Sequence, residues 1–357
     1  MTSTRRIAVN TGGGDAPGLN AVIRAVVRSA ENLGWEVFGI LDSYDGLFEE
    51  DGVIPLDRKA VRGITHQGGT ILGTTNRGNP LKWPVHEPDG SVRYEDRSQE
   101  VVDAIHGHGI DALIAIGGDG SLEIAHHLSA KGLNVVGVPK TIDNDLAATN
   151  RTFGFMTAVE TATDAIGKLH STAEAHERVM VVELMGRHAG WISLFAGVAG
   201  TADVILIPEI PYSMDSVCKK IEERWAAGRE FAIVVVAEGA YPAGGEPLFK
   251  SGKRLGGIAK VVSDEIHERT GYETRELVLG HLQRGGSPIA YDRLLALRFG
   301  CAAVEMVRQE NFGTMVALDP PRVHAVPLAD AISRRKTVPL DSDVVATARA
   351  LGTCLGD

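Results

Sequence analysis

Residues 7–40 read IAVNTGGGDAPGLNAVIRAVVRSAENLGWEVFGI and contain the pattern that decides the fold. An apolar run at 7–10 leads into a glycine-rich loop, an amphipathic stretch at 16–31 and a second apolar run at 36–40. Short apolar runs are typical of buried strands and longer amphipathic stretches of helices, so we predict strand, loop, helix and strand. The same patterns predict strands at 112–116, 135–139, 179–183, 204–208 and 233–237, and helices at 121–130, 156–171, 214–226, 257–269 and 291–309.

The alternation of strands and helices predicts an α/β fold with a largely parallel sheet and right-handed crossovers. A length of 357 residues suits either two lobes or one large doubly wound domain. Ligand sites in such sheets lie at the carboxyl ends of the strands, where the loops gather. Segments 79–98 and 241–252 are rich in proline, glycine or charged residues, which predicts exposed excursions from the sheet.

Composition and charge limit the possible partners. Apolar residues make up 44% and charged residues 23% of the chain, as in ordinary globular proteins. The formal net charge is −10 and no run of basic residues reaches five. Both facts argue against nucleic acid or an anionic membrane as the main partner.

The cysteines and the apolar runs favour a reducing, aqueous compartment. Cys218, Cys301 and Cys354 are far apart and odd in number, so they fit neither a disulfide framework nor a CxxC metal site. Residues 1–6 lead directly into the first strand without the apolar region of a signal peptide, and no apolar run approaches membrane-spanning length. We therefore expect a soluble cytoplasmic enzyme.

The loop at 12–18, GGGDAPG, has the composition of a phosphate-binding turn. Its glycines allow a tight turn and a close approach of the backbone to a ligand, and free N–H groups at a helix start favour an anion. The loop is not GxGxxG, and no GxxxxGK[ST] motif occurs in the chain, which weakens a dehydrogenase and a P-loop nucleotidase. Taken alone, the loop is as compatible with a plain tight turn as with a phosphate site.

Two further loops carry acidic residues after predicted strands. Residues 117–121 read GGDGS, where Asp119 could bind a Mg²⁺ that is also coordinated by phosphate oxygens. The pattern is not specific, because NAD kinases and lipid kinases share it. Residues 139–145 read PKTIDND. One of Asp143 and Asp145 could accept the proton of an attacking hydroxyl while the other serves a metal or the transition-state charge. A solvated acidic turn is the alternative, which Lys140, Thr141 and the preceding strand make less attractive.

In their order these motifs resemble the phosphofructokinase family. Six segments match, and together they extend over residues from about 7 to 300. They are GGGDAPG at 12–18, GGTILG at 68–73, GGDG at 117–120, TIDND at 141–145, VVELMGRHAG at 181–190 and GHLQRGGSP at 280–288.

The resemblance implies a role for each matched residue, with Asp143 as the general base on the sugar 1-hydroxyl. The implied catalytic set is Asp143, Thr141, Asp145, Arg187 and Lys140. The implied donor contacts are Gly13, Tyr44, Arg77, Gly118, Gly120 and Ser121, with Mg²⁺ on Asp119. The implied sugar-phosphate contacts are Thr141, Asp143, Arg178, Met185, Gly186, Arg187, Glu238, Arg275, His281 and Arg284.

The resemblance also implies a fold and a reaction. Two doubly wound α/β lobes with largely parallel sheets would hold the active site in the cleft between them. The donor lobe would comprise residues 1–154 and about 286–335, and the sugar lobe residues 155–285 and about 336–357. The implied reaction is the glycolytic transfer of the γ-phosphoryl group of Mg·ATP to the 1-hydroxyl of fructose 6-phosphate.

The implied assembly is a homo-oligomer with two-fold interfaces, and we expect a dimer of dimers. In this family arginines of the neighbouring chain complete the sugar site. Arg178 and Arg275 match those positions, so the site would be shared between subunits.

Two residues give opposite indications about the donor. Lys140 resembles the lysine of pyrophosphate-dependent members, whereas Gly120 resembles ATP-using members, because an aspartate there would collide with the α-phosphate of ATP. A lysine attracts either donor, so we expect ATP, with pyrophosphate as the alternative. Asn76 stands where ATP-using members have an arginine, so the cation would shift to Arg77, and Ile124 replaces a glycine that borders the adenosine.

The resemblance further implies weak effector control. Arg24, Arg28, Arg58 and Arg229 match basic positions of the bacterial nucleotide-effector site, whereas His170, Ala227 and Glu230 replace other cations. The loss of cations and the added carboxylate should weaken an anionic effector.

Two other functions explain less of the sequence. A non-catalytic sugar-phosphate-binding regulator would not need the acidic residues Asp119, Asp143 and Asp145. A NAD kinase would account for GGDG but not for the segments TIDND and GHLQRGG.

Overall fold

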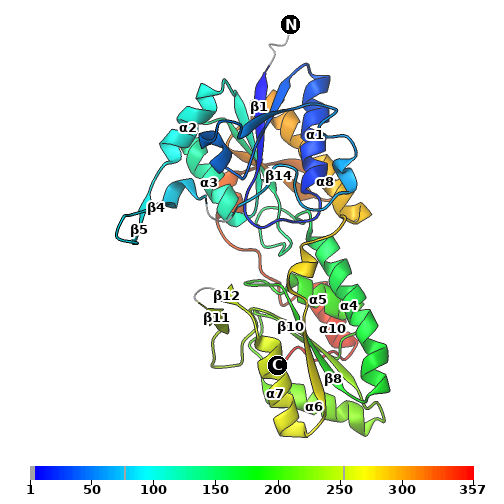
Figure 1. The fold of residues 1–357 in the computed structure, drawn as a ribbon. Coiled ribbons are helices and arrows are strands. Elements are labelled where there is room, and N and C mark those ends of the chain that lie inside the picture. Colours follow the sequence, from blue (N-terminus) through cyan, green and yellow to red (C-terminus); the bar gives the residue numbers. More distant parts are fainter. Residues whose placement is uncertain (1–4, 76–77, 252–253) are drawn as a thin grey trace. The chain divides into compact units, whose positions relative to one another are not determined.

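The structure, a computed structural model, describes residues 5–75, 78–251 and 254–357 (Figure 1). The chain forms two compact units, each built around a sheet. The first unit comprises Met1–Thr141, Leu146–Gly154 and Arg284–Arg335. The second unit comprises Ile142–Asp145, Phe155–Gln283 and Lys336–Asp357.

The first unit contains a 7-stranded sheet with the order β15-β14-β7-β6-β1-β2-β3. Its strands are β1 (Arg6–Thr11), β2 (Glu36–Ile40), β3 (Val53–Leu56), β6 (Ala112–Gly117), β7 (Val135–Pro139), β14 (Thr314–Asp319) and β15 (Arg322–Pro327). Neighbouring strands run parallel except at the two edges, where β3 and β15 run antiparallel to their neighbours. The prediction of a largely parallel α/β sheet is therefore confirmed.

Helices cover both faces of this sheet. They are α1 (Leu19–Asn32), α2 (Ser98–Gly107), α3 (Asp119–Ala130), α8 (Ala290–Arg308) and α9 (Leu328–Ile332). Ile7 and Val9 pack with α1 and α8 in one core cluster, while Ala8 packs with α2 and α3 in another. This alternation is the period of two that a strand buried on both faces must show. Figure 1 shows α1 and α8 side by side on one face.

The second unit contains a 4-stranded parallel sheet with the order β13-β8-β10-β9. Its strands are β8 (Val179–Leu184), β9 (Val204–Leu206), β10 (Ala232–Ala237) and β13 (Thr274–Val278). Its helices are α4 (Phe155–Ala175), α5 (Trp191–Ala199), α6 (Met214–Ala226), α7 (Ile258–Thr270) and α10 (Asp343–Ala350). Residues of α6 and α7 pack with β8, β9 and β10 in one buried cluster.

The two predicted excursions contain short elements of their own. Within 79–98, β4 (Trp83–His86) and β5 (Val92–Glu95) form an antiparallel hairpin that projects from the first unit (Figure 1). Tyr94 is 66% exposed, as an excursion from the sheet requires. Near the second excursion, β11 (Phe249–Ser251) pairs with β12 (Arg254–Leu255).

Some predicted bounds differ from the observed ones. Helix α1 begins at Leu19 rather than at 16, because Gly18 has a φ of 113° and cannot continue a right-handed helix. Helix α3 begins at Asp119, two residues earlier than predicted, and β9 ends at Leu206 rather than at 208. Within the described ranges no helix is both long and apolar enough to cross a membrane.

Candidate active site

Three of the sequence motifs begin side by side at the carboxyl ends of strands of the first sheet. They follow β1, β6 and β7, which are neighbours and end at the same side. The Gly12 N–H donates to the Ile116 carbonyl at 2.9 Å, and the Lys140 N–H donates to the Gly117 carbonyl at 2.9 Å. The strand order reverses between β1 and β6, the kind of switch point at which open α/β sheets bind ligands.

Two of the glycines that follow these strands are required by close packing. A Cβ at Gly12 would lie 2.7 Å from the Ser121 hydroxyl, and one at Gly117 would lie 2.1 Å from the Ser121 Cβ. Gly13 has a φ of 75°, in the left-handed region that glycine adopts readily. The predicted donor contact Gly13 thus lies in the glycine-rich loop, which touches the first turn of α3, where Gly120 and Ser121 follow Gly118.

Lys140 ties the glycine-rich loop to β7. Its Nζ donates to the Gly12 carbonyl at 2.9 Å and also to the Gly14 carbonyl. The residue is only 3% exposed. A buried lysine in this position both shapes the loop backbone and adds positive charge beneath it.

Asp119 lies at the start of α3 with its carboxylate half-exposed. One oxygen accepts the Gly120 N–H at 2.8 Å, and the other lies 3.4 Å from Nη2 of Arg335. Both partners of this ion pair are about half exposed, so it holds the carboxylate only weakly. Across the described ranges, no group of three or more acidic, histidine or cysteine side chains could hold a metal.

The arginine of the GHLQRGG segment also contacts the glycine-rich loop. Nη1 of Arg284 donates to the Asp15 carbonyl at 3.1 Å, and a Cβ at Gly14 would lie 3.0 Å from that nitrogen. A Cβ at Gly68 would meet the Gly286 carbonyl at 2.3 Å. The GGTILG segment therefore packs against Gly286 within the first unit.

In the second unit, the ends of the neighbouring strands β8 and β10 bring the predicted sugar contacts together. The Glu238 N–H donates to the Leu184 carbonyl at 2.8 Å, directly before Met185. Gly186 has a φ of 142°, and a Cβ there would lie 2.9 Å from the Ala189 carbonyl. A Cβ at Gly239 would lie 2.1 Å from the Arg187 carbonyl, so Met185, Gly186, Arg187 and Glu238 form one group.

Two residues that the predictions omit hold this group in place. Gln283 is fully buried, and its side-chain oxygen accepts the Met185 N–H at 3.3 Å. Glu209 accepts the Gly190 N–H at 3.0 Å, where α5 begins, and burial raises the pKa of its carboxyl. Gln283 lies inside the GHLQRGGSP motif and could have been found there, whereas Glu209 lies in none of the six motifs.

The Asp143 loop belongs to the second unit. Ile142–Asp145 lie in that unit, whereas the prediction assigns them to the donor lobe. A contact with the second unit accounts for this difference, because the N–H of Lys336, a residue of that unit, donates to the Asp145 carbonyl at 2.8 Å. Thr141 stays with the first unit, where its carbonyl accepts the Thr152 hydroxyl at 2.7 Å.

Two predicted sugar-phosphate contacts lie at the opposite end of the second sheet from Met185. Arg178 directly precedes β8, whereas Met185 directly follows it, so about 20 Å of strand lies between them. Arg275 pairs in register with Met180 near the same amino end. Glu273 binds both arginines, at 3.0 Å to Arg178 and 2.5 Å to Arg275, and this pairing lowers its pKa.

The remaining predicted contacts are placed as follows. Tyr44 is 2% exposed, and burial raises the pKa of its hydroxyl to about 12, so a ligand could touch little of it. His281 is exposed in the 3-10 turn Gly280–Gln283. Arg77 and the neighbouring Asn76 lie outside the described residues.

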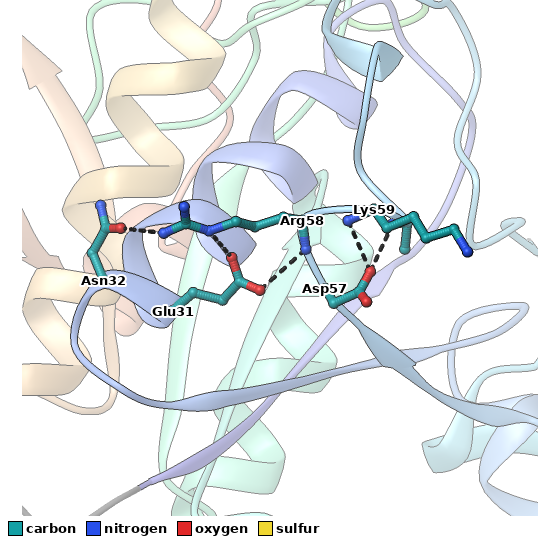
Figure 2. Close-up of polar contacts among 6 residues, drawn as sticks. Glu31, Asn32, Asp57, Arg58 and Lys59 are labelled. Atoms are coloured by element: carbon teal, nitrogen blue, oxygen red, sulfur yellow. Dashed lines mark hydrogen bonds and ion pairs between the residues drawn. The ribbon is translucent and has the colours of Figure 1, made fainter.

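Arg58, one of the matched effector cations, is bound by groups of its own unit (Figure 2). Its Nε donates to Glu31 at 2.9 Å, its Nη2 donates to Asn32 at 2.8 Å, and its N–H donates to Glu31 at 3.1 Å. The Glu31 carboxylate offsets part of the positive charge of the guanidinium, which leaves less of it for an anionic ligand.

Comparisons with known proteins agree with this arrangement. The sequence of an ATP-dependent 6-phosphofructokinase from Chloroflexus aggregans is 52% identical over 356 residues, which cover 99% of this chain and 98% of that protein. A pyrophosphate–fructose 6-phosphate 1-phosphotransferase from Amycolatopsis methanolica is 51% identical over 94% of this chain and 96% of its own. The crystal structure of Pichia pastoris phosphofructokinase in the T-state matches with a TM-score of 0.81 at 32% identity, and the match covers 99% of this chain and 37% of the Pichia chain.

The sequence also matches the model of one protein family over most of its length. That family is described as Phosphofructokinase, and the match covers residues 6–307, a range that contains all six motifs. With the motifs gathered at the strand ends and relatives identical at half of their positions, the chain belongs to the phosphofructokinase family.

Proposed function

We propose that the chain is a 6-phosphofructokinase, which transfers the γ-phosphoryl group of Mg·ATP to the 1-hydroxyl of fructose 6-phosphate. One observation carries the proposal: the loops after β1, β6 and β7 meet around Lys140, and the last of them continues into Asp143. Fructose 1,6-bisphosphate and ADP are the products. This phosphotransferase works in the cytoplasm, which the three free cysteines support.

The chemistry is an in-line displacement at the γ-phosphorus. Asp143 accepts the proton of the sugar 1-hydroxyl. At the same time the hydroxyl oxygen forms a bond to the γ-phosphorus, and the bond between that phosphorus and the ADP oxygen breaks. Thr141 and Asp145 flank the base in the chain, and Lys140 contributes charge under the phosphate loop. Backbone N–H groups near Gly13, Gly118, Gly120 and Ser121 stabilise the donor phosphates. Arg77 completes the donor contacts that we propose, whereas Tyr44 is too buried to add more than a small contact.

Asp119 is the proposed ligand of Mg²⁺. The ion binds through one or two carboxylates and keeps several waters besides the substrate phosphates, so a single half-exposed aspartate suits it. When bound, Mg²⁺ would neutralise charge on the donor phosphates.

The sugar phosphate is held by two sets of residues. Met185, Gly186, Arg187 and Glu238 contact the sugar, and His281 and Arg284 contact the 6-phosphate, with forked donation from the guanidinium. Arg178 and Arg275 lie at the opposite end of the second sheet, which supports their action on the site of a neighbouring subunit. We therefore propose a homo-oligomer, a dimer of dimers, with shared sugar sites.

A mixture of two inactive variants tests the shared site. Asp143→Ala and Arg178→Ala chains are each expected to be nearly inactive, but co-refolded they should recover roughly a quarter of wild-type activity. Half of the random pairs are mixed, and each mixed pair has one intact site of two. Proven subunit exchange without recovery would mean that Arg178 acts within its own chain.

Initial rates with each donor test the reaction itself. We expect higher kcat/KM with ATP than with pyrophosphate, and we expect Gly120→Asp to lower kcat/KM for ATP by about tenfold or more while sparing pyrophosphate. A Cβ at Gly120 meets no heavy atom within 4 Å, so the substitution fits the fold and reports on the ligand. Activity with pyrophosphate alone would reject ATP as the donor.

A pyrophosphate-dependent phosphotransferase with the same sugar chemistry is the second candidate. Two observations favour it, namely Lys140 and the 51% identity to the pyrophosphate-dependent relative. We rank this activity below the ATP-dependent one. Nζ of Lys140 donates hydrogen bonds to the loop carbonyls, so the lysine would stabilise the loop with either donor.

A further inference from the structure

Lys336 contacts the loop that carries Asp143, although no sequence motif includes it. Its Nζ donates to Oδ1 of Asn144 at 3.0 Å, and its N–H donates to the Asp145 carbonyl at 2.8 Å. Both contacts lie within the second unit. They therefore hold the two residues that directly follow Asp143.

Asn144 is the residue whose conformation directs this loop. It is fully buried and has a φ of 52°, in the left-handed region that asparagine tolerates better than most residues. Because Asn144 follows Asp143 directly, its conformation sets the direction in which the chain leaves the proposed base. A hydrogen bond from an ammonium group to the Asn144 amide is charge-assisted and stronger than a neutral one.

Lys336 itself is anchored to a rigid element. The indole N–H of Trp191, the first residue of α5, donates to the Lys336 carbonyl at 2.9 Å. The Lys336 Nζ lies 5.8 Å from the centre of the Trp191 ring, within the range of a cation–π contact. Two residues later, the Val338 N–H donates to Glu209 at 2.8 Å, and Glu209 also accepts from Gly190.

We propose that Lys336 is a positioning residue, which fixes Asn144 and thereby presents Asp143 to the sugar hydroxyl. The inference rests on the proposed function, since it needs Asp143 to be the base. Lys336 acts through Asn144 rather than on the substrate, so its loss should reduce turnover more than substrate binding. Small displacements of a reacting group reduce the rate strongly even where binding is preserved.

Matched variants separate this role from a general one in stability. Lys336→Met keeps the length of the side chain and removes the donor, and Asn144→Gly removes the acceptor while still permitting a positive φ. We expect each to lower kcat by about tenfold, with both KM values within about twofold of wild type. The double variant should be no slower than either single one, because both remove the same contact. Lys219→Met, an exposed lysine of α6, is the control.

Amide hydrogen exchange of residues 142–146 gives a readout that needs no activity. Lys336→Met and Asn144→Gly should raise exchange there to the same extent, and Lys219→Met should not. Unchanged exchange, unchanged kcat, or multiplicative losses in the double variant would each overturn the proposal. A wild-type chain that phosphorylates no fructose 6-phosphate with either donor would instead reject the proposed function, while the exchange data would still decide whether Lys336 holds the loop.

Discussion

Asp143→Asn is expected to lower kcat by about 10²–10⁴-fold while the KM for fructose 6-phosphate changes little. Asparagine has the shape of aspartate and keeps the loop geometry, but it cannot accept the proton of the 1-hydroxyl. The contacts of Lys336 with Asn144 and Asp145 do not involve the Asp143 side chain, so the loop should stay in place. Initial rates at saturating donor measure the effect.

The control for Asp143→Asn is Asp264→Asn, which removes an exposed carboxylate on α7. It should leave kcat unchanged. The melting temperature of both variants should stay near that of the wild type. Turnover near the wild-type value in Asp143→Asn would remove Asp143 from the role of base.

Lys140→Met should lower kcat/KM for ATP by about 10²-fold. The substitution removes the donor to the Gly12 and Gly14 carbonyls at a position that is 3% exposed. Each buried polar group that loses its partner costs about 1–3 kcal/mol, and a tenfold change corresponds to about 1.4 kcal/mol. The glycine-rich loop would then relax away from the shape that receives the phosphates, and positive charge near them would be lost.

Kinetics with both donors, together with thermal unfolding, check the Lys140 prediction. Lys168→Met, an exposed lysine of α4, serves as the control and should change neither kcat/KM nor stability. Should Lys140→Met be too unstable to assay, Lys140→Gln keeps a donor nitrogen and should retain more activity than Lys140→Met. A folded Lys140→Met enzyme with unchanged kcat/KM for both donors would contradict this role of the lysine.

Many of the buried strands and helices could be predicted because burial leaves a regular pattern in the sequence, but the buried strand β14 and the buried helix α5 were not predicted. The bounds of β2, β7 and α6 are as predicted. The edge strand β13 was not predicted, because its half-exposed positions carry Arg275 and Glu276 instead of an apolar run. The edge strand β15 was not predicted either, because its exposed positions carry Arg322 and His324. The antiparallel pairing of β3 and β15 likewise depends on which neighbour is available at the edge, which a local pattern does not record.

The candidate site was predictable where its residues lie in short motifs after strands. Parallel strands bring their carboxyl ends together, so loops distant in sequence meet without any further signal. Lys336 and Glu209 could not be found in this way. Lys336 reaches Asn144 across 192 positions of sequence through a single hydrogen bond, and a lysine in an irregular segment has no distinguishing local pattern.

Identification of the products by phosphorus NMR tests the central claim most directly. With fructose 6-phosphate, ATP and Mg²⁺, we expect ADP and fructose 1,6-bisphosphate to form in equal amounts, and chelation of Mg²⁺ to stop both. Asp143→Asn should produce neither at a comparable rate. Release of free phosphate from ATP without a second phosphate on the sugar, or no reaction with either ATP or pyrophosphate, would contradict the proposed phosphoryl transfer.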